Sequence, residues 1–373
     1  MLVAAEDKKG DGRLKLAESV PRDELNTVVR TAISQDGKFL YAVSFRIAAL
    51  NAYARDPKTG RLDNQQTITD VNNLAGATDV RLSPDGRLVL AIAFASKAAL
   101  LYSRDPQTGK LSLLDVARDG EKAVRLRWPI QGAFSPDSKL VSVLDDAGAG
   151  DRAPGAVVNF RVNGGKLELA GIDEGKDACY SGARGLAVHP SGKTLFIAAY
   201  RASALVVAEP DPKSGNTSVR QVVRDDEGAV HGLAGAFGVG LSPDGRHVYV
   251  CAGRFGGDDA VSAFRLTADG RLAVIQEFVD GGGELQGFLG GNELAVSPDG
   301  LNVYAVATRS GSVASFRRDP ESGKLTYLET IPDCAEGGPN GAAGISVSPD
   351  NQFVYVATED KSTISIFKRD TGK

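Results

Sequence analysis

The sequence predicts an all-β protein made of seven similar units, and three observations lead to this prediction. A tetrapeptide close to Ser-Pro-Asp-Gly occurs seven times, and consecutive copies start 49 to 55 residues apart. Apolar and polar residues alternate in short runs around each copy, as they do in half-buried β-strands. No stretch keeps the periodicity of a helix. The seven copies begin at Ser34, Ser83, Ser135, His189, Ser242, Ser297 and Ser348.

The fifth unit shows the elements in order. Residues 239–241 form a first strand that ends in the tetrapeptide turn, and 247–252 form the second strand. Residues 261–265 and 272–274 form the third and fourth strands, with a turn between them. Within the tetrapeptide, proline presets φ, aspartate accepts backbone hydrogen bonds and glycine adopts a positive φ, so a hairpin is expected. We interpret the aspartates as turn formers, because their spacing differs from that of a calcium-binding loop.

A second motif marks the turn between the third and fourth strands. Arg-Asp-Pro, one polar residue, Thr or Ser, and then Gly occur at 55–60, 104–109 and 318–323. Four strands in each of seven units predict a seven-bladed β-propeller of four-stranded antiparallel blades. Because one blade cannot bury both of its faces, neighbouring blades must pack on one another, and residues 1–373 are predicted to form a single domain.

The two ends of the chain predict how the ring closes. Residues 363–373 contain a third strand and its turn, with no fourth strand after them. Residues 12–18 resemble the fourth strand of the other units. We therefore expect the N-terminal segment to form the outer strand of the last blade, where it pairs an edge that would otherwise be open.

Composition bounds the class of protein and its partners. The chain is 42% hydrophobic and 24% charged with a formal net charge of −4, so we expect no nucleic-acid surface. No apolar run is long enough to span a membrane, and no metal-ligand spacing or cofactor motif occurs. We expect a monomer that uses no metal and no cofactor. A cytosolic start and an export signal lost ahead of Met1 both remain open. Cys179 and Cys334 lie in similar loops and could pair.

The tetrapeptide also aligns the positions at one end of the predicted central channel. Charged and polar groups from blades one to four and blade six are expected at this end. The residues four before each copy are Arg30, Asp79, Gln131, Gly185, Gly238, Glu293 and Gly344. The residues five before each copy are Val29, Thr78, Ile130, Arg184, Phe237, Asn292 and Ala343.

These charges allow two interpretations. In the first, Arg30, Arg81 and Arg184 bind an anionic sugar or acid. Glu293 or Asp79 then acts as general base beside Arg184. In the second, the same groups form a salt-bridged plug in a narrow tunnel. The sequence leaves both open.

Four further residues are candidates for ligand binding. Gln131 and Asn292 occupy aligned channel positions. Trp128, the only tryptophan, suits either a sugar-stacking platform or packing between blades. His231 lies in a loop on the candidate face, and we consider it the one histidine placed for chemistry.

The repeated Ser-Pro-Asp-Gly-Arg-His-Val-Tyr-Val, followed by Val-Ser-Ala-Phe-Arg and by Arg-Asp-Pro-x-Thr-Gly-x-Leu, resembles the seven-bladed lactonase-like propeller family. That family includes 6-phosphogluconolactonase-type sugar lactonases and carboxy-muconate cyclases, and the resemblance covers essentially the whole chain. It implies a pocket in which an Arg-His pair of a Gly-Pro-Arg-His motif contacts the substrate. The matching stretch is Gly182-Ala183-Arg184-Gly185, where the arginine is retained and glycine replaces the histidine.

Two functions follow from these observations. The first is an enzyme, a carboxylic ester hydrolase acting on a sugar lactone or related acid, with Glu293 or Asp79 activating water and Arg184 and Arg30 holding the oxyanion. The second is a non-catalytic propeller that binds a glycan or a protein, which the missing histidine favours. Whether the chain is an enzyme is left open by the sequence.

Overall fold

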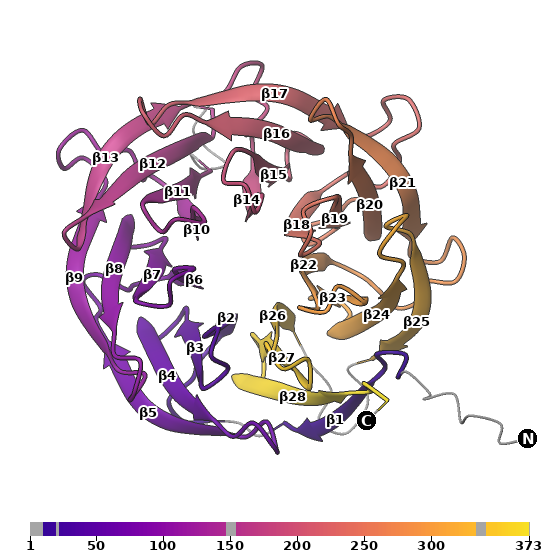
Figure 1. Cartoon of the computed structure of the whole chain (residues 1–373), viewed down its shortest axis with the longest axis horizontal. Coiled ribbons are helices and arrows are strands. Elements are labelled where there is room, and N and C mark those ends of the chain that lie inside the picture. The colour runs from indigo at the N-terminus through magenta and orange to yellow at the C-terminus, as the bar shows by residue number, and fades with distance from the viewer. Residues whose placement is uncertain (1–9, 20–21, 147–153, 333–340, 373) are drawn as a thin grey trace, which may run out of the picture.

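The computed structural model describes residues 10–19, 22–146, 154–332 and 341–372, and these residues form seven four-stranded sheets. The sheets are arranged as blades around a central axis, with the first strand of each blade innermost (Figure 1). Within a blade, strands that follow one another in the sequence pair antiparallel as hairpins. The predicted seven-bladed β-propeller is therefore confirmed. No described segment forms a helix long and apolar enough to cross a membrane.

The first four blades follow the chain in order. Blade 1 contains β2 (Val28–Ile33), β3 (Phe39–Ser44), β4 (Ala49–Arg55) and β5 (Leu62–Thr69). Blade 2 contains β6 (Ala77–Leu82), β7 (Leu88–Ala93), β8 (Ala98–Arg104) and β9 (Leu111–Arg118). Blade 3 contains β10 (Pro129–Phe134), β11 (Leu140–Asp145), β12 (Ala156–Asn163) and β13 (Lys166–Asp173). Blade 4 contains β14 (Ala183–Val188), β15 (Leu195–Ala199), β16 (Ala204–Pro210) and β17 (Thr217–Arg224).

The last three blades include the closure. Blade 5 contains β18 (Ala236–Leu241), β19 (His247–Ala252), β20 (Ala260–Leu266) and β21 (Leu272–Val279). Blade 6 contains β22 (Gly291–Val296), β23 (Asn302–Ala307), β24 (Ser312–Arg318) and β25 (Leu325–Ile331). Blade 7 contains β26 (Ala342–Val347), β27 (Phe353–Thr358) and β28 (Thr363–Arg369), and its outer strand is β1 (Leu14–Glu18).

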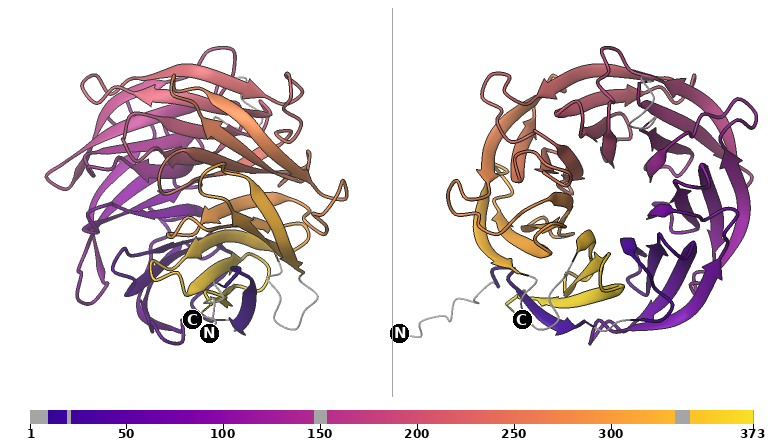
Figure 2. Two further views of the ribbon diagram at one scale, coloured as in Figure 1. Left: turned by 45° about the vertical axis from the view of Figure 1, so that its right-hand side comes forward. Right: turned by 180° about the vertical axis from the view of Figure 1, so that it is seen from behind.

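The ring closes through the N-terminal strand, as the sequence predicts. β1 pairs antiparallel with β28, with Leu14 opposite Arg369 and Leu16 opposite Phe367. The N-terminal strand β1 and the C-terminal strand β28 consequently lie side by side in blade 7 (Figures 1 and 2). The Tyr304 hydroxyl also donates a 2.7 Å hydrogen bond to the Gly12 carbonyl, which ties the N-terminal segment to blade 6.

The tetrapeptides are turns with a built-in hydrogen bond. In the six copies that begin with serine, the serine Oγ donates to the aspartate Oδ1 over 2.5–2.6 Å. In the fourth copy, the equivalent hydrogen bond joins His189 Nδ1 and the Ser191 hydroxyl, which are 2.8 Å apart. At the 1/2 interface, the Asp36 Oδ2 also accepts from Arg104 of the next blade, whose Nε donates to the Tyr41 hydroxyl. Equivalent arginines join blades 5 and 6, 6 and 7, and 7 and 1.

The core consists of seven apolar clusters, one between each pair of adjacent blades. In one cluster, for example, Val43 and Leu50 of blade 1 pack with Val89 and Leu100 of blade 2. Since each cluster draws on two blades, every blade depends on both neighbours for burial of its faces. This packing fixes the inner strands rigidly around the axis and so positions the residues at the channel.

Candidate functional site

Every inner strand carries a β-bulge at the same place. In blade 1, Val28 faces Ser44 and Arg30 faces Val43, so Val29 is an extra residue without a partner. The same shift occurs in the other six inner strands. The extra residues are Val29, Thr78, Ile130, Arg184, Phe237, Asn292 and Ala343, the set five before each tetrapeptide. A bulge re-aims side chains and is common beside functional sites.

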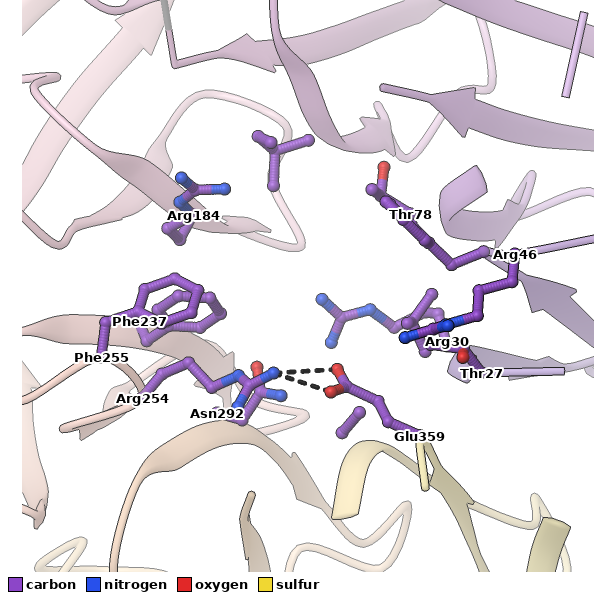
Figure 3. A pocket seen from close by; sticks show the side chains of 14 residues that line it. Thr27, Arg30, Arg46, Thr78, Arg184, Phe237, Arg254, Phe255, Asn292 and Glu359 are labelled. Carbon is purple, nitrogen blue, oxygen red and sulfur yellow. Dashed lines mark hydrogen bonds and ion pairs between the residues drawn. The ribbon is translucent and has the colours of Figure 1, made fainter. Parts of the chain in front are cut away.

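These seven bulge residues all line one cavity of about 350 Å³ at the end of the channel away from the tetrapeptides, which we name the upper cavity. A second set of lining residues comes from the loops after the second strands of blades 1, 5 and 7. This set consists of Phe45, Arg46, Arg254, Phe255 and Glu359. Figure 3 shows the side chains of Arg30, Arg46 and Arg184 directed toward the same space.

Arg184 is held by a buried carboxylate and two aromatic rings. Its Nη2 donates to the Asp146 Oδ2 at 2.5 Å, and Arg201 binds the same carboxylate at 2.8 Å. Its guanidinium lies 5.9 Å from the ring centres of both Phe237 and Phe255, in range of a cation–π interaction. Burial lowers the pKa of Arg184; the Asp146 charge opposes this shift and Arg201 adds to it. The Nε of Arg184 is buried and finds no hydrogen-bond partner within the described part of the chain.

An ion pair joins blades 5 and 7, the two neighbours of blade 6. Arg254 of blade 5 donates from Nη2 to both carboxylate oxygens of Glu359 of blade 7, at 2.8 and 3.0 Å (Figure 3). Arg254 also lies 5.2 Å over the Phe255 ring. Arg46, by contrast, is exposed and forms no ion pair with any described residue. Among the described residues that line the upper cavity, four are arginines and one is a carboxylate.

The floor of the upper cavity is a salt-bridged plug formed by Arg30, Asp79, Glu293 and Arg81. Arg30 is in ion-pair contact with Glu293, and its Nε lies 3.5 Å from Asp79 Oδ1. Arg81 Nε donates to Asp79 Oδ2 at 3.0 Å from the other side. Burial lowers the pKa of Arg30 to about 10, although Asp79 acts against this shift. The structure thus contains both expected arrangements, an open cavity at the bulge residues and a plug made by Arg81 and by the residues that follow the bulge in blades 1, 2 and 6.

The other predicted site residues lie in several places. Asn292 lines the upper cavity, where its Nδ2 donates to Thr308 Oγ1 at 2.8 Å. Gln131 is buried, and its Oε1 accepts the backbone N–H of Leu186 in blade 4. Trp128 lies outside the cavity lining and packs edge-on against Phe94, with ring centres 5.1 Å apart.

His231 lies apart from the other candidates. Its side chain is 62% exposed and its Nδ1 is 3.0 Å from the Asp226 carboxylate. Asp226 raises the pKa of His231 through this hydrogen bond. Cys179 is buried, whereas Cys334 falls outside the described residues, as does the pairing of the two.

Sequence reasoning missed the loop residues of the cavity. Arg46 and Arg254 both stand twelve residues after the first residue of their tetrapeptide, and Arg201 and Arg309 occupy the same position in blades 4 and 6. Glu359 stands eleven after its own copy. The units aligned at this second position carry four arginines, of which Arg46 and Arg254 line the upper cavity.

Comparison with known proteins agrees with the fold. A family model described as "Lactonase, 7-bladed beta-propeller" matches residues 7–128 and 131–337. The chain belongs to this family. A 6-phosphogluconolactonase of Pectobacterium carotovorum is 26% identical over 219 residues, which are 57% of this chain and 60% of that protein. An uncharacterised Lactococcus lactis protein is 26% identical over 130 residues, or 34% of this chain and 36% of that protein. Both of these relatives are thus matched over less than two thirds of their own length.

Solved structures of similar shape include proteins of different kinds. The periplasmic gluconolactonase PpgL of Pseudomonas aeruginosa superposes with a TM-score of 0.71 at 19% identity, over 93% of each chain. The β-propeller domain of Cps50 (Swd1) from Myceliophteria thermophila superposes with a TM-score of 0.69 at 14% identity, over 95% of this chain and 99% of that one. At such identities the likeness to a lactonase structure shows the fold alone.

Proposed function

We propose that the upper cavity binds and hydrolyses a sugar lactone that carries an anionic group, with a phosphorylated gluconolactone as the best candidate. The observation that carries this proposal is the set of four arginines facing one carboxylate in the cavity lining of a lactonase-family chain. Guanidinium groups bind phosphate through paired, charge-assisted hydrogen bonds. The rings of Phe237 and Phe255 supply an apolar wall for the sugar face.

The arginines divide into two roles in this proposal. Arg46 has no carboxylate partner among the described residues, so it can bind the anionic group without first losing an ion pair. Arg184 and Arg30 are each held by buried carboxylates and are therefore fixed in place. Fixed positive charges stabilise the negative charge that develops on the carbonyl oxygen, because they need no reorganisation during the reaction.

Glu359 is the carboxylate best placed to act as general base. It lines the cavity, and Arg254 fixes its orientation by binding both oxygens. Glu293 and Asp79, the bases expected from the sequence, lie in the plug; Asp79 is fully buried and Glu293 borders the space below. Glu359 would take a proton from water as the water oxygen attacks the lactone carbonyl carbon. The ring carbon–oxygen bond then breaks, and the proton passes to the ring oxygen, which yields the open hydroxy acid.

The glycine at the family's histidine position excludes a histidine base at that point of the cavity. A Cβ atom at Gly185 would overlap the carbonyl oxygen of Phe237 in the next blade. A histidine therefore does not fit between these two inner strands. In this chain the proton must be moved by another group, and Glu359 is the one carboxylate among the described cavity-lining residues.

The test compares hydrolysis of 6-phosphogluconolactone and gluconolactone with the spontaneous rate of each. Glu359→Gln should lower kcat by about 10²–10⁴-fold. Arg46→Gln should raise KM for the phosphorylated lactone alone, by about tenfold to a hundredfold, for loss of charge-assisted hydrogen bonds worth about 1.5–3 kcal/mol. Arg309→Gln is the matched control, because Arg309 has the same place in its blade but binds Asp259 and lies outside the cavity lining. Full activity of Glu359→Gln would refute the assigned base.

Gly185 also favours a second candidate function, a non-catalytic binding propeller, because the histidine of the family motif is replaced. In that case the wild type would bind the open acid, 6-phosphogluconate, yet leave the lactone at its spontaneous rate. Calorimetric titration with 6-phosphogluconate alongside the rate assay separates the two functions.

A further inference from the structure

A second cavity lies on the other side of the plug, along the inner strands toward the tetrapeptide turns. Its volume is about 480 Å³, and we name it the lower cavity. The residue two before each tetrapeptide lines it in all seven blades. Six of these residues are small: Ala32, Ala133, Ala187, Gly240, Ala295 and Ser346. The seventh is Arg81, so a single cation projects among small side chains at this level.

Arg81 has hydrogen-bonding capacity that the protein does not use. Its Nε donates to Asp79, but its Nη2 is buried and has no hydrogen-bond partner among the residues that the structure describes. Glu293 Oε1 lies 4.0 Å from that nitrogen, beyond hydrogen-bonding distance. An unsatisfied buried donor costs about 1–3 kcal/mol, which an acceptor in the lower cavity would recover.

The lower cavity has one polar and one apolar side. Glu293, Ser346, Thr31 and Arg81 come from blades 6, 7, 1 and 2, which are neighbours in the ring. Thr31 and Ser346 are joined by a 2.9 Å hydrogen bond between their hydroxyls. Blades 3, 4 and 5 contribute alanine and glycine at the level of Arg81. A ligand with an acceptor at one end and a short apolar part at the other matches both sides.

We propose that the lower cavity is a second binding site, which takes a short aliphatic carboxylate on Arg81. The plug holds two arginines and two carboxylates, so its charges balance before a ligand arrives. This balance favours a monoanion over a doubly charged phosphate, because each further negative charge faces Asp79 and Glu293 at short range. The fork of the guanidinium suits the two oxygens of a carboxylate.

The shared carboxylates couple the lower site to the upper cavity. Asp79 lies between Arg30, which lines the upper cavity, and Arg81, which lines the lower one. A carboxylate bound to Arg81 competes with Asp79 for that guanidinium, and Asp79 then attracts Arg30 more strongly. Occupation of the lower site should therefore weaken anion binding in the upper cavity. Because coupling is reciprocal, an anion in the upper cavity should weaken carboxylate binding at the lower site by the same factor. Couplings of this type change affinity by about fivefold to 150-fold.

The test titrates the whole protein with acetate and with phosphate by calorimetry at low ionic strength, so that it needs no turnover. Acetate should bind the wild type saturably, and saturating acetate should weaken phosphate binding by at least about fivefold. Arg81→Gln should weaken acetate binding at least about tenfold, because one charged hydrogen bond is lost. Arg246→Gln is the matched control, since Arg246 lies beside a tetrapeptide turn but outside the lower cavity.

A second pair of variants keeps the charge and removes the space. Ala32→Leu and Ala133→Leu lie at the level of Arg81 in the two neighbouring blades and should each weaken acetate binding while phosphate binding persists. Unchanged acetate affinity in Arg81→Gln would overturn the proposal, as would equal affinity for chloride or loss of acetate binding in Arg46→Gln. Because every readout is binding, a failure of lactone hydrolysis leaves this result unaffected.

Discussion

Replacing Arg30 with methionine tests the plug directly. Arg30 and Glu293 have side chains that are each 8% exposed and in ion-pair contact, and Asp79 is fully buried beside them. Methionine keeps much of the side-chain volume but leaves two carboxylates facing the single cation Arg81. Removing one partner of a buried ion pair typically costs about 3–5 kcal/mol, because the remaining charge is uncompensated. We expect a loss of that size in the free energy of unfolding.

Urea denaturation at neutral pH measures this loss as a shift of the midpoint at unchanged slope. The double variant Arg30→Met with Glu293→Met should recover part of it, since Arg81 and Asp79 then remain as a balanced pair at 3.0 Å. The expected coupling between the two sites is about 0.5–3 kcal/mol. Arg61→Met is the control, because Arg61 pairs with Glu18 at 3.1 Å but is 75% exposed, and such pairs contribute about 0–1 kcal/mol. If Arg30→Met costs no more than Arg61→Met, the reasoning is refuted.

Three further predictions concern closure, packing and pH. Deletion of residues 1–18 removes β1 and should lower Tm sharply, because β28 and Tyr304 lose their partners; an unchanged Tm in calorimetry contradicts this. Gly185→Ala should lower Tm through overlap with Phe237, whereas Gly283→Ala, with nothing within 4 Å, should not. Burial, with Asp225 and Asp226, raises the pKa of Asp258 from 3.8 to about 6. Its protonated form therefore stabilises the fold below about pH 4, and this contribution is lost as pH rises through 6. Asp258→Asn should flatten that part of the stability–pH curve, and an unaltered curve would exclude Asp258 as its cause.

The repeat predicted the fold and its closure because each unit carries the same local rules. The tetrapeptide fixes a hairpin, and alternation around it fixes which side chains are buried. Residues 12–18 could be assigned to the last blade because only that blade lacked a strand in sequence. These inferences depend on local chemistry that is repeated seven times, so an atypical unit does not change the pattern that the other units share.

The site was predicted only in part because of the bulges. Residues of both adjacent rows were expected at one site, although simple alternation places neighbouring residues of a strand on opposite faces. The bulge instead turns Arg184 into the cavity and leaves Asp79 in the plug beneath it. Gln131 and Asp79 accept backbone N–H groups of the next inner strands, Leu186 and Gly132. Such contacts between blades are set by the spacing of the ring and leave no local signal in the sequence.

Rarity in the sequence was a poor guide to position. Trp128 is unique and His231 is one of three histidines, yet one packs against Phe94 and the other lies exposed beside Asp226. The common residue arginine instead supplies most of the charge in the upper cavity.

The upper cavity is lined by one bulge residue from every blade, so a ligand bound there would contact blades all around the ring and stabilise their arrangement. A molecule held by Arg46, Arg184 and Arg254 would bridge blades 1, 4 and 5, which share no sheet. Ligand present at a hundred times its Kd stabilises the folded state by about 2.7 kcal/mol. That stabilisation comes from across the central channel, where the described residues of the protein supply the plug and the Arg254–Glu359 ion pair. Resistance to unfolding in a cell would then follow the supply of ligand, and an unoccupied ring would be the form that opens first.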